Sequence, residues 1–166
     1  MRRLSLPLLL VSLVAVPTFL AAQAASTAKP AASTAQPAAG RVIAIDATDA
    51  MKFSVTTIAA KPGEQLTIRL KGVGTMPKLA MAHNFILLKA TANATTFAND
   101  GMMVGAPGNY IAAARKGDVL ASTGLVGPGE TATVTFKAPT KPGTYPYLCS
   151  FAGHFAAGMK GTLVVK

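Results

Sequence analysis

Three Pro-Gly turns, each followed by a strand-like stretch, constrain the fold of this chain more than any other feature. They lie at residues 61–64, 127–130 and 141–144. After the first turn, apolar and polar side chains alternate over residues 66–71, and after the second they alternate over 132–137. A period of two over that length is typical of a strand that buries one face. The chain is therefore expected to consist mainly of short β-strands joined by tight turns.

Further short strands are predicted at residues 42–46, 53–58, 83–88, 119–123, 145–149 and 161–165. About eight strands with short connections favour an all-β fold in which two sheets pack as a sandwich. Residues 90–117 do not follow this pattern, because they contain stretches rich in Asn, Gly and Ala. We expect this region to form a flap outside the sandwich, with a short helix over residues 109–116 that ends at Gly117.

Residues 1–24 have the features of a secretory signal peptide. Two arginines precede an apolar run over residues 4–20, and the small residues Ala22 and Ala24 indicate cleavage after Ala24. The alternative is an uncleaved N-terminal anchor, which would be the chain's one route to a membrane. We therefore expect an exported protein, located in the periplasm or another extracytoplasmic compartment.

Residues 25–40 contain only Ala, Ser, Thr, Pro, Gln, Gly and one Lys, and we expect them to form a flexible linker. Residues 41–166 are then a single folded domain. Loss of the two signal-peptide arginines leaves 14 of the 16 basic side chains against 6 acidic ones, a net charge of about +8. The basic residues are scattered, without basic runs or interleaved aromatic residues, so we expect a monomer with no nucleic-acid partner.

The candidate chemistry lies in the C-terminal stretch, where Cys149, His154 and Met159 occur within eleven residues between two predicted strands. The second histidine, His83, opens another predicted strand. A thiolate with two imidazoles is a trigonal ligand set that favours copper, and a weak axial thioether completes a blue-copper site. This site would use the one cysteine and both histidines of the chain. The sequence therefore predicts one copper ion bound by His83, Cys149, His154 and Met159.

Other kinds of site fit the sequence less well. A structural zinc site usually combines four Cys or His ligands, often in CxxC pairs, and the chain has too few of them. A cysteine nucleophile activated by histidine would need an orienting residue such as Asn84, and it leaves Met159 unexplained. A copper enzyme with a second, His-rich metal site needs more than two histidines. We therefore expect a protein that is not an enzyme.

Two segments, residues 76–84 and residues 147–163, resemble the cupredoxins and, within them, the azurins and auracyanins. The resemblance implies an eight-stranded Greek-key β-sandwich with a copper ion near one end. It assigns the four ligands named above. It also implies that Asn84 ties the two ligand loops together, and that the backbone N–H groups of Asn84 and Phe151 support the thiolate.

The sequence departs from the azurin pattern at several positions. Four residues separate His154 from Met159, as in auracyanins, whereas azurins have three. Ala82 stands where azurins have a glycine whose carbonyl lies near the copper. Phe85 replaces the usual buried tryptophan, and the azurin disulfide cannot form with one cysteine.

The resemblance implies a type 1 copper protein that carries single electrons between redox partners, such as a cytochrome c-like protein or an oxidase or reductase. The alternative is a periplasmic protein that binds, stores or delivers copper without electron transfer. For the carrier, we expect His154 to be the electron port. It would reach the surface through an apolar patch formed by Met76, Ala80, Met81, Met102, Ala152, Phe155 and Ala156.

Overall fold

The computed structural model describes residues 40–166, so the predicted signal peptide and all but the last residue of the predicted linker lie outside the described residues. That last residue, Gly40, is buried against Gln65. No helix within residues 40–166 has the length and hydropathy needed to cross a bilayer.

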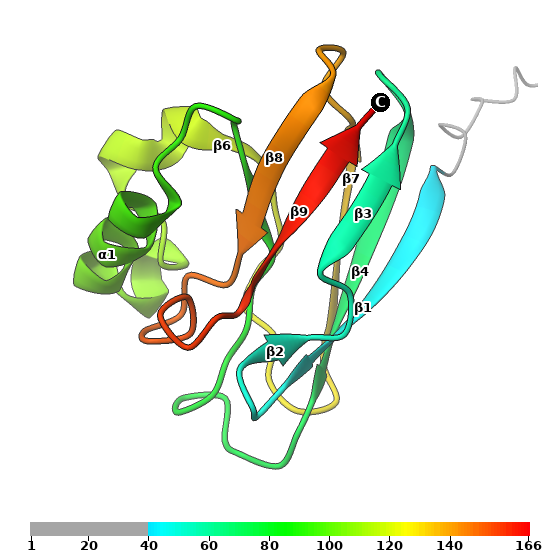
Figure 1. Cartoon of the computed structure of the whole chain (residues 1–166). Coiled ribbons are helices and arrows are strands. Elements are labelled where there is room, and N and C mark those ends of the chain that lie inside the picture. The colour runs from blue at the N-terminus through cyan, green and yellow to red at the C-terminus, as the bar shows by residue number, and fades with distance from the viewer. Residues whose placement is uncertain (1–39) are drawn as a thin grey trace, which may run out of the picture. The chain divides into compact units, whose positions relative to one another are not determined.

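Two β-sheets pack face to face in the described domain (Figure 1). The four-stranded sheet has the order β2-β1-β4-β7 and the five-stranded sheet the order β3-β9-β8-β5-β6. In the first sheet the strands are β1 (Arg41–Thr48), β2 (Lys52–Phe53), β4 (Gln65–Val73) and β7 (Thr131–Lys137). In the second they are β3 (Thr57–Ala60), β5 (Ile86–Leu88), β6 (Val119–Ser122), β8 (Gly143–Leu148) and β9 (Lys160–Val165). Both sheets are mixed, because β1 pairs parallel to β4 and β3 pairs parallel to β9.

Alternating side chains build the core between the sheets. Leu66, Ile68 and Leu70 of β4 are fully buried, whereas the intervening residues face outward. The opposing sheet contributes Tyr147, whose ring lies 4.9 Å from that of Phe85 and whose hydroxyl donates to the Val55 carbonyl over 2.6 Å. Phe85 thus fills, with an aromatic ring, the core position at which the resemblance to azurins implies a tryptophan. The predicted sandwich is confirmed.

The strands differ in detail from the sequence-based prediction. The stretch predicted as one strand over 53–58 is divided into β2 and β3, which belong to different sheets, so nine strands are present in residues 40–166. The strand predicted over 83–88 shortens to β5, and His83 pairs only through an isolated bridge to Val126. A chain that crosses from one sheet to the other must leave the ladder, and alternation alone does not mark that point.

The helix predicted over residues 109–116 is wrong. The α-helix is α1 (Ala94–Val104), followed by the 3₁₀ turns η1 (Ala106–Gly108) and η2 (Ala113–Asp118). Asn93 caps α1, because its side-chain oxygen accepts from the Thr96 backbone N–H over 3.0 Å. Asn109 and Tyr110 adopt left-handed backbone angles, with φ of 52° and 54°, which a right-handed helix does not tolerate. The flap itself, outside the sandwich, is present (Figure 1).

Within the flap, Gly101 allows α1 to pack closely against the backbone at Tyr110. It is buried, and a Cβ added there would overlap the carbonyl oxygen of Tyr110. We expect Gly101→Ala to lower the free energy of unfolding by about 2 kcal/mol, because the overlap outweighs the gain of about 1 kcal/mol in helix propensity. Urea unfolding of the metal-free protein measures the change. Gly117→Ala is the matched control, since a Cβ there meets nothing within 4 Å; equal effects of the two changes would contradict the packing argument.

Candidate metal centre

Three buried side chains meet at one end of the sandwich. One ligand atom each of His83, Cys149 and His154 lies within 4.8 Å of the others. The two imidazole rings are 4.9 Å apart between centroids, and the Cys149 Sγ lies 3.5 Å from the His154 Nδ1. His83 comes from the segment before β5, whereas Cys149 directly follows β8. The structure thus brings the cysteine and both histidines together across 66 residues of sequence.

The loop between β8 and β9 folds back on itself and so places its residues around one point. Leu148 and Lys160 are paired across the two strands, and next to them the Cys149 N–H donates to the Met159 carbonyl over 3.1 Å. The Met159 N–H in turn donates to the His154 carbonyl over 2.9 Å. Met159 is fully buried. This bonding places the backbone of Met159 beside Cys149, as a ligand role for both requires.

Asn84 links the two loops that supply the candidate ligands. Its side-chain oxygen accepts from the Ser150 backbone N–H over 2.9 Å, and its Nδ2 donates to the Ser150 hydroxyl over 3.1 Å. The same Nδ2 donates to the Asn109 carbonyl over 3.0 Å, which adds the flap to the connection. The side-chain bonds of Asn84 therefore join backbone segments, and they do not orient an imidazole as a cysteine-nucleophile site would need.

Burial makes Cys149 a poor thiolate in the absence of a cation. Removal from water raises the pKa of the thiol to about 12, although the backbone N–H groups of Asn84 and Phe151 donate toward the sulfur and oppose the rise. These two donors favour negative charge on the sulfur. A metal ion that displaces the thiol proton therefore meets a sulfur already supported by two hydrogen bonds.

Both histidines are held in the neutral form that binds metals. Burial and, to a smaller extent, the neighbouring His83 together lower the pKa of His154 to about 4. Burial also lowers the pKa of His83, against the opposing charge of Asp49. Among buried side-chain nitrogen and oxygen atoms of residues 40–166, the Nδ1 of His83 has no hydrogen-bond partner. A buried ring nitrogen without a partner is costly for a protein, unless it is a ligand.

These observations test whether the residues fit a copper ion. The cluster offers one thiol sulfur and two neutral imidazoles, with a buried methionine in the adjoining turn. One thiolate and two imidazoles with a weak thioether suit copper, while structural zinc prefers four strong Cys or His ligands. Such an ion would bind the His83 Nδ1, which has no hydrogen-bond partner. The residues therefore fit copper.

Other residues predicted to serve the site lie beside the cluster. Ala82 is buried next to His83. The ring of Phe151 lies between those of Tyr110 and His154, at centroid distances of 4.9 and 4.8 Å. Ser150 and Asn109 were not predicted. Asn109 lies in the stretch taken for a helix, and its tolerance of a left-handed backbone was the signal that could have identified it.

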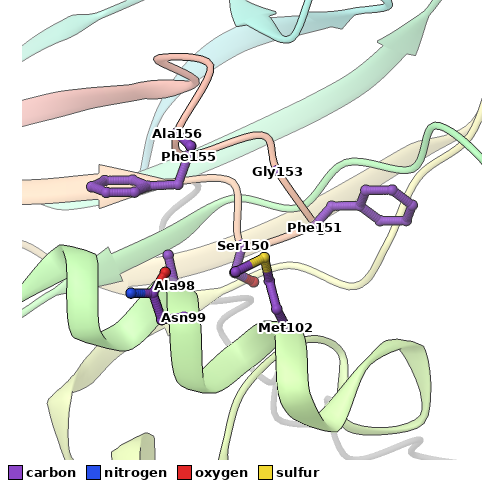
Figure 2. Close-up of a pocket in the computed structure, with 8 residues that line it drawn as sticks. All are labelled: Ala98, Asn99, Met102, Ser150, Phe151, Gly153, Phe155 and Ala156. Carbon is purple, nitrogen blue, oxygen red and sulfur yellow. The ribbon is translucent and has the colours of Figure 1, made fainter.

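The members of the predicted apolar patch differ in exposure. Met76 and Met102 are 42% and 43% exposed, and the three alanines, Ala80, Ala152 and Ala156, are also exposed. Met81 and Phe155 are half-buried. Figure 2 shows Met102 of α1 extending toward the Cys149–Met159 loop, and the rings of Phe151 and Phe155 pointing away from each other. Phe155 packs on the smaller core cluster beneath α1. A cavity of about 30 Å³ separates α1 from this loop.

Comparison with known proteins supports this description. Azurin from Achromobacter denitrificans is 43% identical over 124 residues, covering 72% of this chain and 80% of that relative. Auracyanin A, a blue copper protein from Chloroflexus aurantiacus, has a TM-score of 0.66 at 34% identity and covers 76% of this chain and 98% of its own. An azurin from Methylomonas sp. strain J also has a TM-score of 0.66, at 32% identity, with coverage of 75% and 97%.

A model of copper-binding proteins of the plastocyanin/azurin type matches residues 40–166, the whole of the described domain. This match includes the three clustered side chains and the turn that carries Met159. The chain belongs to the plastocyanin/azurin family of copper-binding proteins.

Proposed function

We propose that this protein is an exported type 1 copper protein that carries single electrons between redox partners and is not an enzyme. His83, Cys149 and His154 would hold the copper, with the Met159 thioether as a weak fourth ligand. The bound copper supplies the one-electron change between Cu(II) and Cu(I). The observation that carries the proposal is the buried cluster of one thiol and two neutral imidazoles within 4.8 Å. It leaves no histidine for a second copper site, because both histidines of the chain are used.

The residues around the cluster are suited to a site that changes charge with little movement. The Asn84 side chain joins the segment of His83 to that of Cys149 through Ser150, and all four residues are buried. The N–H groups directed at the Cys149 sulfur come from these same rigid segments. Fixed dipoles of this kind stabilise the electron-rich sulfur in either oxidation state, so little reorganisation accompanies electron transfer.

His154 is the proposed electron port. It is 2% exposed and lies in the loop that also carries Ala152 and Ala156, both of which are exposed. The patch residues around it would form a small, transient contact with a partner, as is usual for redox encounters. We propose that this partner is a cytochrome c-like protein, an oxidase or a reductase in the periplasm. An uncleaved N-terminus would keep the carrier at the membrane.

Met81→Lys tests the port. Two copies that meet through the patch would each bring a lysine into the contact, and the repulsion is expected to slow electron self-exchange about fivefold to tenfold at low salt. Line broadening in partly oxidised samples measures the rate. Val42→Lys is the control, because Val42 is 54% exposed on β1 and pairs with Thr67, away from the ligand loops. Equal rates in all three proteins would refute the port. Rapid loss of copper to a chelator during cycling would instead favour storage or delivery.

A further inference from the structure

An exposed lysine from the other sheet holds the loop between His154 and Met159. The Nζ of Lys52 donates to the carbonyl of Ala157 over 2.7 Å, although 105 residues separate the two in sequence. Lys52 lies in β2, whose next residue, Phe53, is buried and packs 5.8 Å from the ring of Tyr147. The backbone of Lys52 is therefore held in place by the packing of its neighbour Phe53 in the core. Figure 1 shows β2 at the same end of the domain as the loop.

The backbone of the loop leaves the Ala157 carbonyl free to receive this contact. The N–H groups of Ala157, Gly158 and Met159 donate back to the carbonyls of Gly153, Phe155 and His154 over 2.9–3.0 Å. These bonds form a compact turn, and the Ala157 carbonyl accepts from the ammonium on its outside. Gly158 completes the fit: its φ is 93°, and a Cβ there would lie 2.9 Å from the Lys52 Nζ. A side chain at position 158 would displace the ammonium.

We propose that Lys52 is a positioning residue for the segment that carries the candidate ligands His154 and Met159. It ties the His154–Met159 segment to β2, and its charge lies beside this segment, which carries two of the candidate ligands. The oxidised site has one more positive charge than the reduced site. A nearby ammonium therefore disfavours the oxidised state and raises the reduction potential. The effect on the reduction potential rests on the proposed function, whereas the connection of the loop to β2 concerns the metal-free fold.

The test uses Lys52→Met, which removes the ammonium and keeps most of the side chain, and Lys52→Arg, which keeps the charge and the donors. In the metal-free protein, Lys52→Met is expected to speed amide hydrogen exchange of Gly158 and Met159 about threefold to fivefold, since one hydrogen bond to the turn is lost. In the copper-loaded protein, Lys52→Met is expected to shift the equilibrium between the oxidised and reduced forms about threefold toward the oxidised form. This corresponds to a reduction potential lower by about 28 mV, at 59 mV per tenfold change. Lys52→Arg should retain both wild-type values.

Lys137→Met is the matched control for charge. Lys137 is exposed at the end of β7 that pairs with Gln65, whereas the ligand loops lie at the opposite end of the strands. An equal potential shift in Lys137→Met and Lys52→Met would show a net-charge effect and overturn the local role of Lys52. Unchanged exchange at Gly158 and Met159 in Lys52→Met would overturn the positioning role, whatever the metal does. Failure of the wild-type protein to bind copper would refute the proposed function, while the exchange experiment still decides on Lys52.

Discussion

Cys149→Ser is expected to abolish the intense visible absorption of the copper-loaded protein, because a Cu(II)–thiolate bond is the source of such a band in blue copper sites. Serine is close to cysteine in size, so the metal-free fold should remain. Far-ultraviolet circular dichroism of the metal-free variant checks that the fold is intact. Cys149 is the chain's one cysteine and it is buried, so no other thiol can substitute for it.

Met159→Leu is the matched control for this experiment. It replaces another buried residue of the same loop but leaves the thiolate in place, so the intense band should remain, shifted rather than lost. Retention of the band in Cys149→Ser would mean that the thiol is not a ligand. Complete loss of the band in Met159→Leu would contradict the weak axial role of the thioether.

Asn84→Ala is expected to lower the free energy of unfolding of the metal-free protein by about 3–5 kcal/mol. The change removes the bonds from Asn84 to Ser150 and Asn109. It also leaves the buried Ser150 N–H without its acceptor, and each unpaired buried group costs about 1–3 kcal/mol. Urea unfolding followed by circular dichroism measures the difference.

Asn99→Ala provides the comparison for Asn84→Ala. Asn99 lies exposed on α1, so the same truncation there is expected to change stability by less than about 0.5 kcal/mol. A loss below about 1 kcal/mol in Asn84→Ala would contradict a connecting role for its side chain. In the copper-loaded protein, the variant should also alter the visible spectrum, since the segments of His83 and Cys149 are no longer joined.

Local patterns in the sequence were sufficient for much of the fold. Alternation over residues 66–71 and 132–137 identified β4 and β7, because the period of a strand is a property of adjacent residues. The same reasoning failed at α1, where a buried glycine and an asparagine cap occupy positions that look like loop. A glycine is needed at position 101 because a Cβ there would overlap the carbonyl oxygen of Tyr110. A contact between distant residues cannot be read from helix propensity.

For the candidate ligands too, the sequence predicted one part of the site and the tertiary structure decided the rest. Cys149, His154 and Met159 share one short loop, so their proximity follows from the chain itself, and His83 was included as the chain's other histidine. The tertiary structure decided that the His83 ring lies 4.9 Å from that of His154 and that its Nδ1 has no hydrogen-bond partner. It also decided that both imidazoles are buried, which lowers their pKa values and keeps them neutral.

By itself, the sequence determined which side chains are available for the chemistry and which strands bury one face, because both follow from residue type and short-range spacing. Only the tertiary structure decided which distant segments meet. The bond from Lys52 to Ala157 joins segments of two different sheets, whereas the bonds from Asn84 to Ser150 and Asn109 depend on the pairing of β5 with β8 and on the position of the flap. Register is settled by the packing of the whole core, so no local pattern along the chain specifies these contacts.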